Sequence, residues 1–268
     1  MMKKTSRMQL KNIRKLLKEK KIRDFENIFV AEGEKIVRDM LLKGHTLDSV
    51  FVSSSFAKKK DARKLLLDLD KREIPVFEAG DAEFDRLSSL QHSQGILSVV
   101  KKPAGPKRPY PKGKNALAVL CDGIQDPGNL GTIIRTSAAM GADLVMLFGE
   151  CADVFNPKVV RASSGTILDI PVVKCNAGEV DRMKQKGYQL LVSHLERKKG
   201  QDITTIKKIP ARCIVVFGSE GKGVSKKILE RADKFFYIPI SKKIESLNVT
   251  SAAAITLYAV RYTLNAGK

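Results

Sequence analysis

The stretch Tyr237–Tyr262, YIPISKKIESLNVTSAAAITLYAVRY, decides the fold expected for this chain. It joins a short apolar strand end, Ile238–Ile240, through a polar turn to an almost uncharged helix rich in alanine. The turn carries Ser246 and Asn248. Polar groups between a buried strand and a buried helix usually bind a ligand or take part in chemistry. This segment therefore predicts the edge of a functional site.

Working outward, apolar runs and amphipathic segments alternate over residues 115–268. Near-continuous apolar strands between such helices predict an α/β domain with a mainly parallel sheet and helices on both faces. Ligands bind such sheets at the carboxyl ends of the strands. The expected strands are 116–121, 144–148, 171–173, 188–192, 213–217 and 235–238, and the expected helices are 128–140, 157–162, 180–186, 224–231 and 247–264.

Residues 101–114, KKPAGPKRPYPKGK, hold four prolines, two glycines and six cations without apolar periodicity. This composition predicts an extended linker. Residues 1–100, before it, alternate strand and helix patterns typical of a small α/β sandwich domain. The expected helices are 7–21, 34–43, 55–71 and 81–90, and the expected strands are 28–30, 50–52, 74–77 and 96–100.

The formal net charge of +20 favours a polyanionic partner, nucleic acid first and an anionic membrane surface second. The first 25 residues hold ten Lys or Arg against two acids. These cations could form a face that contacts nucleic-acid phosphates without reading bases, or they could belong to a solvated amphipathic helix with no partner. Both interpretations stay open at this point.

The cysteines and histidines, which are the residue types that could bind metals or form disulfides, are scattered along the sequence. No CxxC pair is present, which fits a reducing compartment and argues against zinc. No hydrolytic triad and no metal cluster assembles from the histidines. Without a signal peptide or a run of about 18 apolar residues, we expect a soluble, cytoplasmic protein. The residues concerned are Cys121, Cys151, Cys175, Cys213, His45, His92 and His194.

Two further loops follow expected strands. In DPGNLGTIIRT (126–136), Asn129 is placed to cap the next helix. Arg135 lies on that helix among apolar neighbours and needs a partner, either a ligand phosphate or carboxylate or a buried structural ion pair. In VFGSEGKGVS (216–225), glycines permit tight turns, while Glu220 would repel a phosphate and suit a cation, a hydroxyl or an amide.

The opening turn has a plain structural alternative. Ser246 or Asn248 could simply cap the N-terminus of the last helix, which requires no ligand. Each loop alone is therefore ambiguous.

Together, DPGNLGTIIRT (126–136), VFGSEGKGVS (216–225) and IPISKKIESLNVTSAAA (238–254) closely resemble the SpoU family of S-adenosylmethionine-dependent RNA 2′-O-ribose methyltransferases. The N-terminal domain resembles that family's small substrate-binding domain. The resemblance implies a trefoil knot in the C-terminal domain, an exception to the rule that chains do not knot.

The resemblance also implies the site. Backbone at Gly218, Ile238 and Leu247 would hold the adenosine part of the methyl donor. The polar active-site positions match Asn129, Arg135, Glu220, Ser246 and Asn248. The family is dimeric, with the knot at the interface and Arg135 near the partner's cofactor. No metal is implied.

The chemistry needs an in-line attack by a ribose hydroxyl and help with its deprotonation. Because arginine stays protonated at neutral pH, we expect Arg135 to clamp an RNA phosphate rather than act as the base. Ser246, Asn248 or Glu220 would assist. Ribosomal RNA is the favoured substrate and transfer RNA the alternative.

Two other classes compete. A nucleotide-dependent oxidoreductase would need a G-x-G-x-x-G turn, which the loop DGIQDPGNLG lacks. A non-catalytic RNA-binding module on the same fold would show cofactor binding without methyl transfer.

Overall fold

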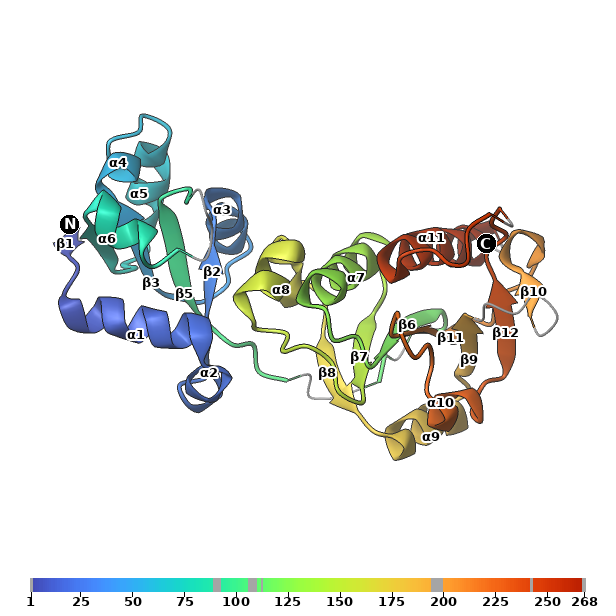
Figure 1. The fold of residues 1–268 in the computed structure, drawn as a ribbon. Helices are drawn as coiled ribbons and strands as arrows, with labels where there is room; N and C mark the ends of the chain where they lie inside the picture. Colours follow the sequence, from blue (N-terminus) through green and yellow to red (C-terminus); the bar gives the residue numbers. More distant parts are fainter. Residues whose placement is uncertain are drawn as a thin grey trace. The chain divides into compact units, whose positions relative to one another are not determined.

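The computed structural model describes residues 2–88, 93–105, 110–111, 113–193, 200–241 and 243–266 (Figure 1). The chain divides into two compact units. The first comprises Met1–Ala104 and Phe155–Leu168, and the second comprises Gly105–Val154 and Asp169–Lys268. A segment from the later half of the sequence thus belongs to the first unit. The domain boundaries expected from the sequence stay a prediction, and 106–109 and 112 of the expected linker lie outside the described residues, as do His92 and His194.

The first unit contains a mixed five-stranded sheet in the order β1-β4-β3-β5-β2. β3 pairs in parallel with β4 and antiparallel with β5, and β5 pairs antiparallel with β2. The small α/β sandwich expected from the sequence is confirmed. The strands are β1 (Lys3–Lys4), β2 (Ile28–Glu32), β3 (Leu47–Ser53), β4 (Val76–Ala79) and β5 (Ile96–Lys101).

Helix α1 shows why the helices of this unit form where they do. Ser6 caps it in a capping box with Gln9, and Leu10, Ile13 and Leu16, which recur at helical spacing, are buried. The single helix expected over 7–21 is wrong, because Glu19 takes an extended conformation (φ −109°, ψ 109°) between α1 and α2. The helices are α1 (Arg7–Lys18), α2 (Lys20–Phe25), α3 (Glu34–Leu42), α4 (Ser54–Ala57), α5 (Ala62–Lys71), α6 (Asp81–Asp85), α8 (Pro157–Ala162) and η1 (Thr166–Leu168).

The segment Phe155–Leu168 packs on β2. The Phe155 and Phe29 rings lie 4.9 Å apart between centroids. The Arg161 guanidinium lies 3.9 Å from the buried carboxylate of Glu32. The first unit is thus completed by chain that follows β7 in the sequence.

The second unit is built on a seven-stranded sheet in the order β10-β12-β9-β11-β6-β7-β8. Every pairing in it is parallel, which confirms the expected mainly parallel sheet. The short edge strand β10 was not expected. The strands are β6 (Ala116–Asp122), β7 (Leu144–Phe148), β8 (Val172–Cys175), β9 (Gln189–Ser193), β10 (Gln201–Asp202), β11 (Arg212–Gly218) and β12 (Lys234–Tyr237).

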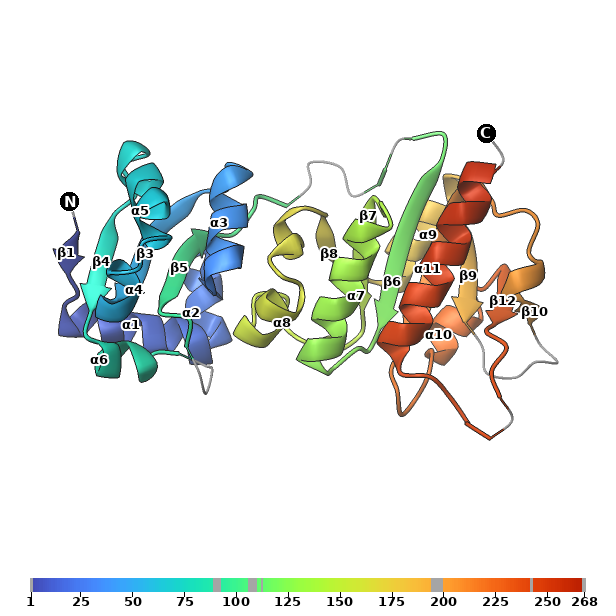
Figure 2. The same cartoon turned by 90° about the horizontal axis from the view of Figure 1, so that it is seen from above.

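Helices cover both faces of this sheet, as expected. Figure 1 shows α7 (Pro127–Ala139) and α11 (Val249–Ala266) on one face, and α9 (Ala177–Gln185) and α10 (Lys226–Leu229) on the other. α7 and α11 contact each other, and Figure 2 shows them alongside the central strands. The short η2 (Ile203–Thr205) follows β10. On the α9 side, Val180, Met183 and Ile228 pack against the strands in one buried cluster.

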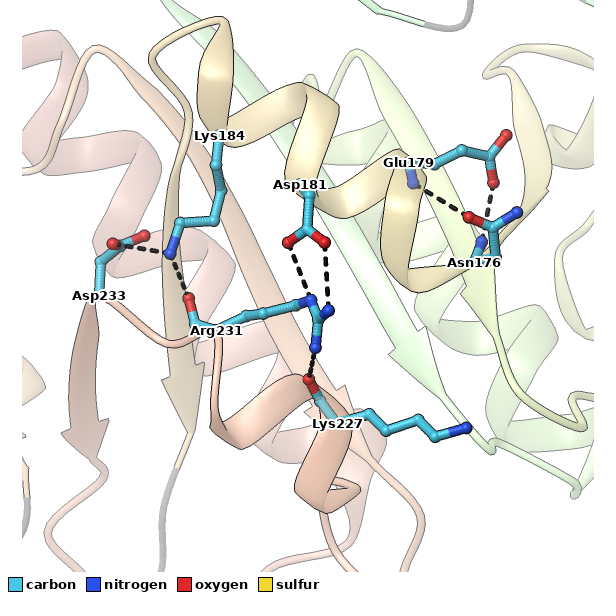
Figure 3. Close-up of polar contacts among 7 residues, drawn as sticks. All are labelled: Asn176, Glu179, Asp181, Lys184, Lys227, Arg231 and Asp233. Carbon is cyan, nitrogen blue, oxygen red and sulfur yellow. Dashed lines mark hydrogen bonds and ion pairs between the residues drawn. The ribbon is translucent and has the colours of Figure 1, made fainter.

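Ion pairs link the α9 and α10 regions (Figure 3). Arg231 donates to both carboxylate oxygens of Asp181, at 2.9 and 3.1 Å, and to the Lys227 carbonyl at 2.7 Å. Lys184 pairs with Asp233 at 2.9 Å and donates to the Arg231 carbonyl at 2.5 Å. The helix expected over 224–231 is shorter in the structure and comprises only α10. The residues after α10 turn toward β12 instead of continuing the helix.

Candidate functional site

The candidate site lies where the carboxyl ends of β6 and β11 meet. In the strand order, the chain continues from β6 toward one edge of the sheet, to β7. From β11 it continues toward the opposite edge, to β12. Such a reversal leaves a crevice that ligands occupy in open α/β sheets. At this point Asp122 is in register with Gly218 on β11 and with Phe148 on β7.

The start of α7 is set by Asp126 rather than by Asn129. The Asp126 carboxylate accepts the Asn129 N–H at 2.7 Å, and Pro127 occupies the first helical position. The expectation that Asn129 caps this helix is therefore wrong. Its side chain is left available for another contact.

That contact joins the first turn of α7 to two loops. The Glu220 carboxylate accepts from the Asn129 amide at 2.6 Å and from the Asn248 amide at 3.1 Å. Asn129 lies on α7, Glu220 follows β11, and Asn248 precedes α11. Three of the residues selected from the sequence are thus brought together, although their roles stay predictions.

Asn248 also caps α11, as the structural alternative expected. Its side-chain oxygen accepts the Thr250 N–H at 2.8 Å and the Thr250 hydroxyl at 2.6 Å. The oxygen of this one amide stabilises the helix, and its nitrogen donates to Glu220. The capping and site interpretations are therefore compatible.

The loop after β11 closes on itself. The Ser219 N–H donates to the Gly223 carbonyl at 3.1 Å, and the Gly223 N–H donates to the Ser219 carbonyl at 2.8 Å. Gly223 has φ +65°, which favours glycine. A Cβ at Gly218 would overlap the backbone of Gly223, so the close approach of these two backbone segments needs glycine at position 218. This closed loop holds Glu220 toward the two amides.

A cavity of about 510 Å³ adjoins these residues. Its volume falls in the range of about 300–1,000 Å³ typical of small-molecule sites. Four carboxylates line it against one cation, Lys222. This balance suits a positively charged ligand and opposes a pyrophosphate. The carboxylates are Asp122, Asp126, Glu150 and Glu220.

Two lining carboxylates, Asp122 and Glu150, were not expected from the sequence. Asp122 is 5% exposed, and its carboxylate accepts the Ser225 N–H at 2.7 Å, so it ties the end of β6 to the loop after β11. An acid as the last residue of an apolar parallel strand was a signal in the sequence. Glu150 follows β7 after a glycine and offered no comparable signal.

Of the residues selected from the sequence, Asn129 and Glu220 line this cavity. The others are not among its lining residues, namely Arg135, Gly218, Ile238, Ser246, Leu247 and Asn248. Arg135 is exposed on α7, and within the described parts of the chain it forms no ion pair. The alternative of a buried structural ion pair at Arg135 is therefore wrong.

The cysteines near the site do not supply a nucleophile. Burial raises the pKa of the Cys151 thiol, which donates to the Cys121 carbonyl at 3.3 Å. Burial likewise raises the pKa of Cys175 to about 12. A thiol needs a lowered pKa to react, so these groups are structural. In the described ranges no cluster of three possible metal ligands occurs, and no helix is long and apolar enough to span a membrane.

The parallel sheet, its switch point and the acidic cavity define an α/β domain whose cavity suits a small cationic ligand. Residues 116–258 match the model of the SpoU rRNA methylase family, and residues 7–98 match an MRM3-like substrate binding domain.

Similar proteins agree with the family match. The chain is 34% identical, over 92% of its length and 94% of the relative, to 23S rRNA (guanosine(2553)-2′-O)-methyltransferase RlmP of Bacillus subtilis. An AdoMet-bound rRNA methyltransferase from Sinorhizobium meliloti has TM-score 0.82 and 28% identity, covering 96% of each chain. A putative RNA methyltransferase of the TrmH family from Porphyromonas gingivalis has TM-score 0.79 and 30% identity, covering 96% of this chain and 98% of the other.

The chain belongs to the SpoU rRNA methylase family. It is an RNA 2′-O-methyltransferase that uses S-adenosylmethionine. The acidic cavity fits this cofactor, because its sulfonium group is cationic.

Proposed function

We propose that this enzyme methylates a ribose 2′-OH in structured ribosomal RNA, with the meeting of Asn129, Glu220 and Asn248 as the centre of its active site. The supporting observation is that the Glu220 carboxylate, which lines the acidic cavity, accepts from the amides of Asn129 on α7 and of Asn248 before α11. The similarity to an enzyme named for guanosine 2553 of 23S rRNA makes the corresponding guanosine the first candidate target.

When bound, S-adenosylmethionine supplies an activated methyl group. The carboxylates of Asp122, Glu150 and Glu220 would bind the cationic sulfonium of this cofactor more favourably than the neutral thioether of its product. The backbone at Gly218, Ile238 and Leu247 would hold its adenosine part beyond the cavity. Carboxylates and glycines form a suitable lining for this ligand, because the carboxylates add negative charge and the glycines add little bulk.

The polar residues would orient the ribose hydroxyl and help remove its proton. Asn129 and Asn248 donate to the Glu220 carboxylate. They would hold it as an acceptor for the proton of the reacting hydroxyl. Ser246, exposed in the turn before α11, would assist. Arg135 would clamp a neighbouring RNA phosphate.

We also infer a homodimer formed through α11. Ile255, Tyr258 and Tyr262 are 43%, 63% and 67% exposed on this helix. They line a largely apolar groove of about 790 Å³ shared with η2. In such a dimer Arg135, which lies outside its own chain's cavity, would serve the partner's site. The double variant Tyr258→Glu/Tyr262→Glu should sediment as a monomer, whereas Leu42→Glu, also at an exposed apolar residue, should not. A monomeric natural protein would contradict the dimer.

Two further properties accompany this proposal. A ribosomal RNA substrate leads us to expect the enzyme in the cytoplasm. The trefoil knot implied by the family resemblance stays a prediction.

The central test measures S-adenosylmethionine binding by calorimetry and labelled-methyl transfer to transcripts of 23S rRNA and of tRNA. We expect binding, and transfer to the 23S transcript at a single ribose. Transfer to tRNA alone would assign the enzyme to tRNA. S-adenosylmethionine binding without transfer to either transcript would contradict the proposed RNA substrate.

A further inference from the structure

A second groove lies in the first unit, between α1 and the residues after α6. It measures about 450 Å³ and is lined by Arg14, Leu17, Lys18, Arg86, Leu87 and Ser88. Leu87 is 2% exposed and belongs to the buried cluster of this unit, and Leu17 packs against that cluster. The floor of the groove is therefore fixed by the core, while its rim carries three exposed cations.

In the described part of the chain, these cations are not paired with an acid. Within the ranges that the structure describes, the side chains of Arg14, Lys18 and Arg86 form no ion pair or hydrogen bond. Other cations of this unit are paired, such as Arg38 with Glu34 at 2.6 Å and Lys102 with Asp24 at 2.6 Å. The groove is therefore a site of uncompensated positive charge.

The charge of α1 opposes the stability of the helix. The helix contains no acidic residue. Arg7 and Lys11, Lys11 and Lys15, and Arg14 and Lys18 are like-charged pairs four residues apart, which destabilise a helix. The capping box at Ser6 and the buried Leu10, Ile13 and Leu16 offset this repulsion. A polyanion bound along the helix would relieve it.

We propose that this groove binds the phosphate backbone of the RNA substrate, with Arg14, Lys18 and Arg86 each neutralising a phosphate. The identity of the polyanion as RNA rests on the proposed function. Cations read phosphates rather than bases, so the groove supplies affinity and orientation while the sequence of the RNA is read elsewhere. Arg14 and Lys18 lie one helical turn apart, which suits successive contacts along a strand.

The test uses the full chain and a 23S rRNA transcript. The groove variant is Arg14→Gln/Lys18→Gln/Arg86→Gln. The matched control is Lys60→Gln/Arg63→Gln/Lys64→Gln, which removes the same charge from exposed residues in and just before α5 of the same unit. RNA affinity is measured from 50 to 200 mM salt, together with S-adenosylmethionine affinity.

We expect the groove variant to bind RNA about 10- to 100-fold more weakly, with a slope of log affinity against log salt smaller by about 2 to 3. The control should keep the natural affinity and slope. Both variants should bind S-adenosylmethionine normally, since the cavity lies in the other unit.

The outcomes separate this proposal from the proposed function. Equal RNA affinity and slope in the groove and control variants would overturn the groove, even if methyl transfer is intact. Failure of the natural protein to bind RNA would overturn both. RNA binding that depends on the groove, without methyl transfer, would leave the groove standing and remove the proposed function.

Discussion

At the scale of single residues, Asn248 divides its amide between two tasks. The oxygen caps α11 through Thr250, and the nitrogen donates to Glu220. One substitution can therefore remove one task and keep the other.

Asn248→Ser should keep the cap and lose the amide donor. We expect the free energy of unfolding to stay within about 0.5 kcal/mol of the natural protein, because serine caps helices about as well as asparagine. Methyl transfer should fall about tenfold or more, since a hydrogen bond to a charged group contributes about 1.5–3 kcal/mol and Glu220 is partly screened by solvent. Asn248→Ala should lose both and cost about 1 kcal/mol of stability. Full activity in the serine variant would leave Asn248 with the capping role only.

Arg135 offers a test of the phosphate clamp. Arg135→Ala should weaken RNA binding and methyl transfer together. Arg135→Lys should recover part of the RNA affinity but little of the transfer, because lysine keeps the charge and loses the planar, two-pronged donor. Kd for RNA and single-turnover transfer rates separate these effects. Full activity with normal RNA affinity in the lysine variant would rule out a bidentate clamp.

At the scale of elements, the loop Ser219–Gly223 depends on how closely two backbone segments approach. Gly218→Ala should lower the apparent Tm by about 3 °C or more and weaken S-adenosylmethionine binding, since overpacking typically costs about 1–3 kcal/mol. The reason is that the new Cβ would meet the backbone of Gly223, which cannot move aside.

Gly221→Ala is the matched control in the same loop. No atom lies within 4 Å of its added Cβ, and its φ is not positive. Its Tm should stay within about 1 °C, because alanine is tolerated where the backbone permits it. An unchanged Tm in Gly218→Ala would show that the loop is looser than its geometry indicates.

The elements were predictable where apolar periodicity was strong. β6, β7 and β11 lie within one or two residues of their expected ranges, because buried parallel strands are continuous apolar runs. The breaks at Glu19 and between α4 and α5 were missed, since charged residues there continue a helical pattern. Strand β10 has two residues and no pattern to detect.

The site was predictable only in part, and for a physical reason. The loops carrying Asn129, Glu220 and Asn248 could be found from turn chemistry and family resemblance. Their convergence on one carboxylate depends on the strand order, which brings β6 beside β11. Local sequence does not encode that neighbourhood, so Glu150 was missed. Asp122 was missed although its place at the end of an apolar strand could have indicated it.

At the scale of the whole molecule, buried thiols link stability to alkaline pH. Burial raises the pKa of Cys175 and of Cys213 to about 12 from an ordinary 9.0. Above pH 9 the unfolded chain loses these protons and the folded chain keeps them. The free energy of unfolding should therefore fall as pH rises from 9 toward 12, by up to about 1.4 kcal/mol per pH unit for each thiol.

Urea unfolding at pH 7 to 11 checks this dependence with Cys213→Ala. The variant should be less stable at pH 7 because it leaves a small cavity, but its stability should fall less steeply above pH 9. Below pH 8 the two proteins should show the same dependence on pH. Parallel curves throughout would mean that Cys213 does not contribute.

The segment Phe155–Leu168 has a consequence for how the protein is made. During translation, the ribosome synthesises Met1–Ala104 and then Gly105–Val154 before it reaches this segment. Until then Phe29 lacks its ring partner, and the buried Glu32 carboxylate lacks Arg161. The first unit therefore cannot complete its packing until Phe155–Leu168 has been synthesised. A gene truncated at the proline-rich stretch would encode a fragment in which β2 lacks the contacts of this segment.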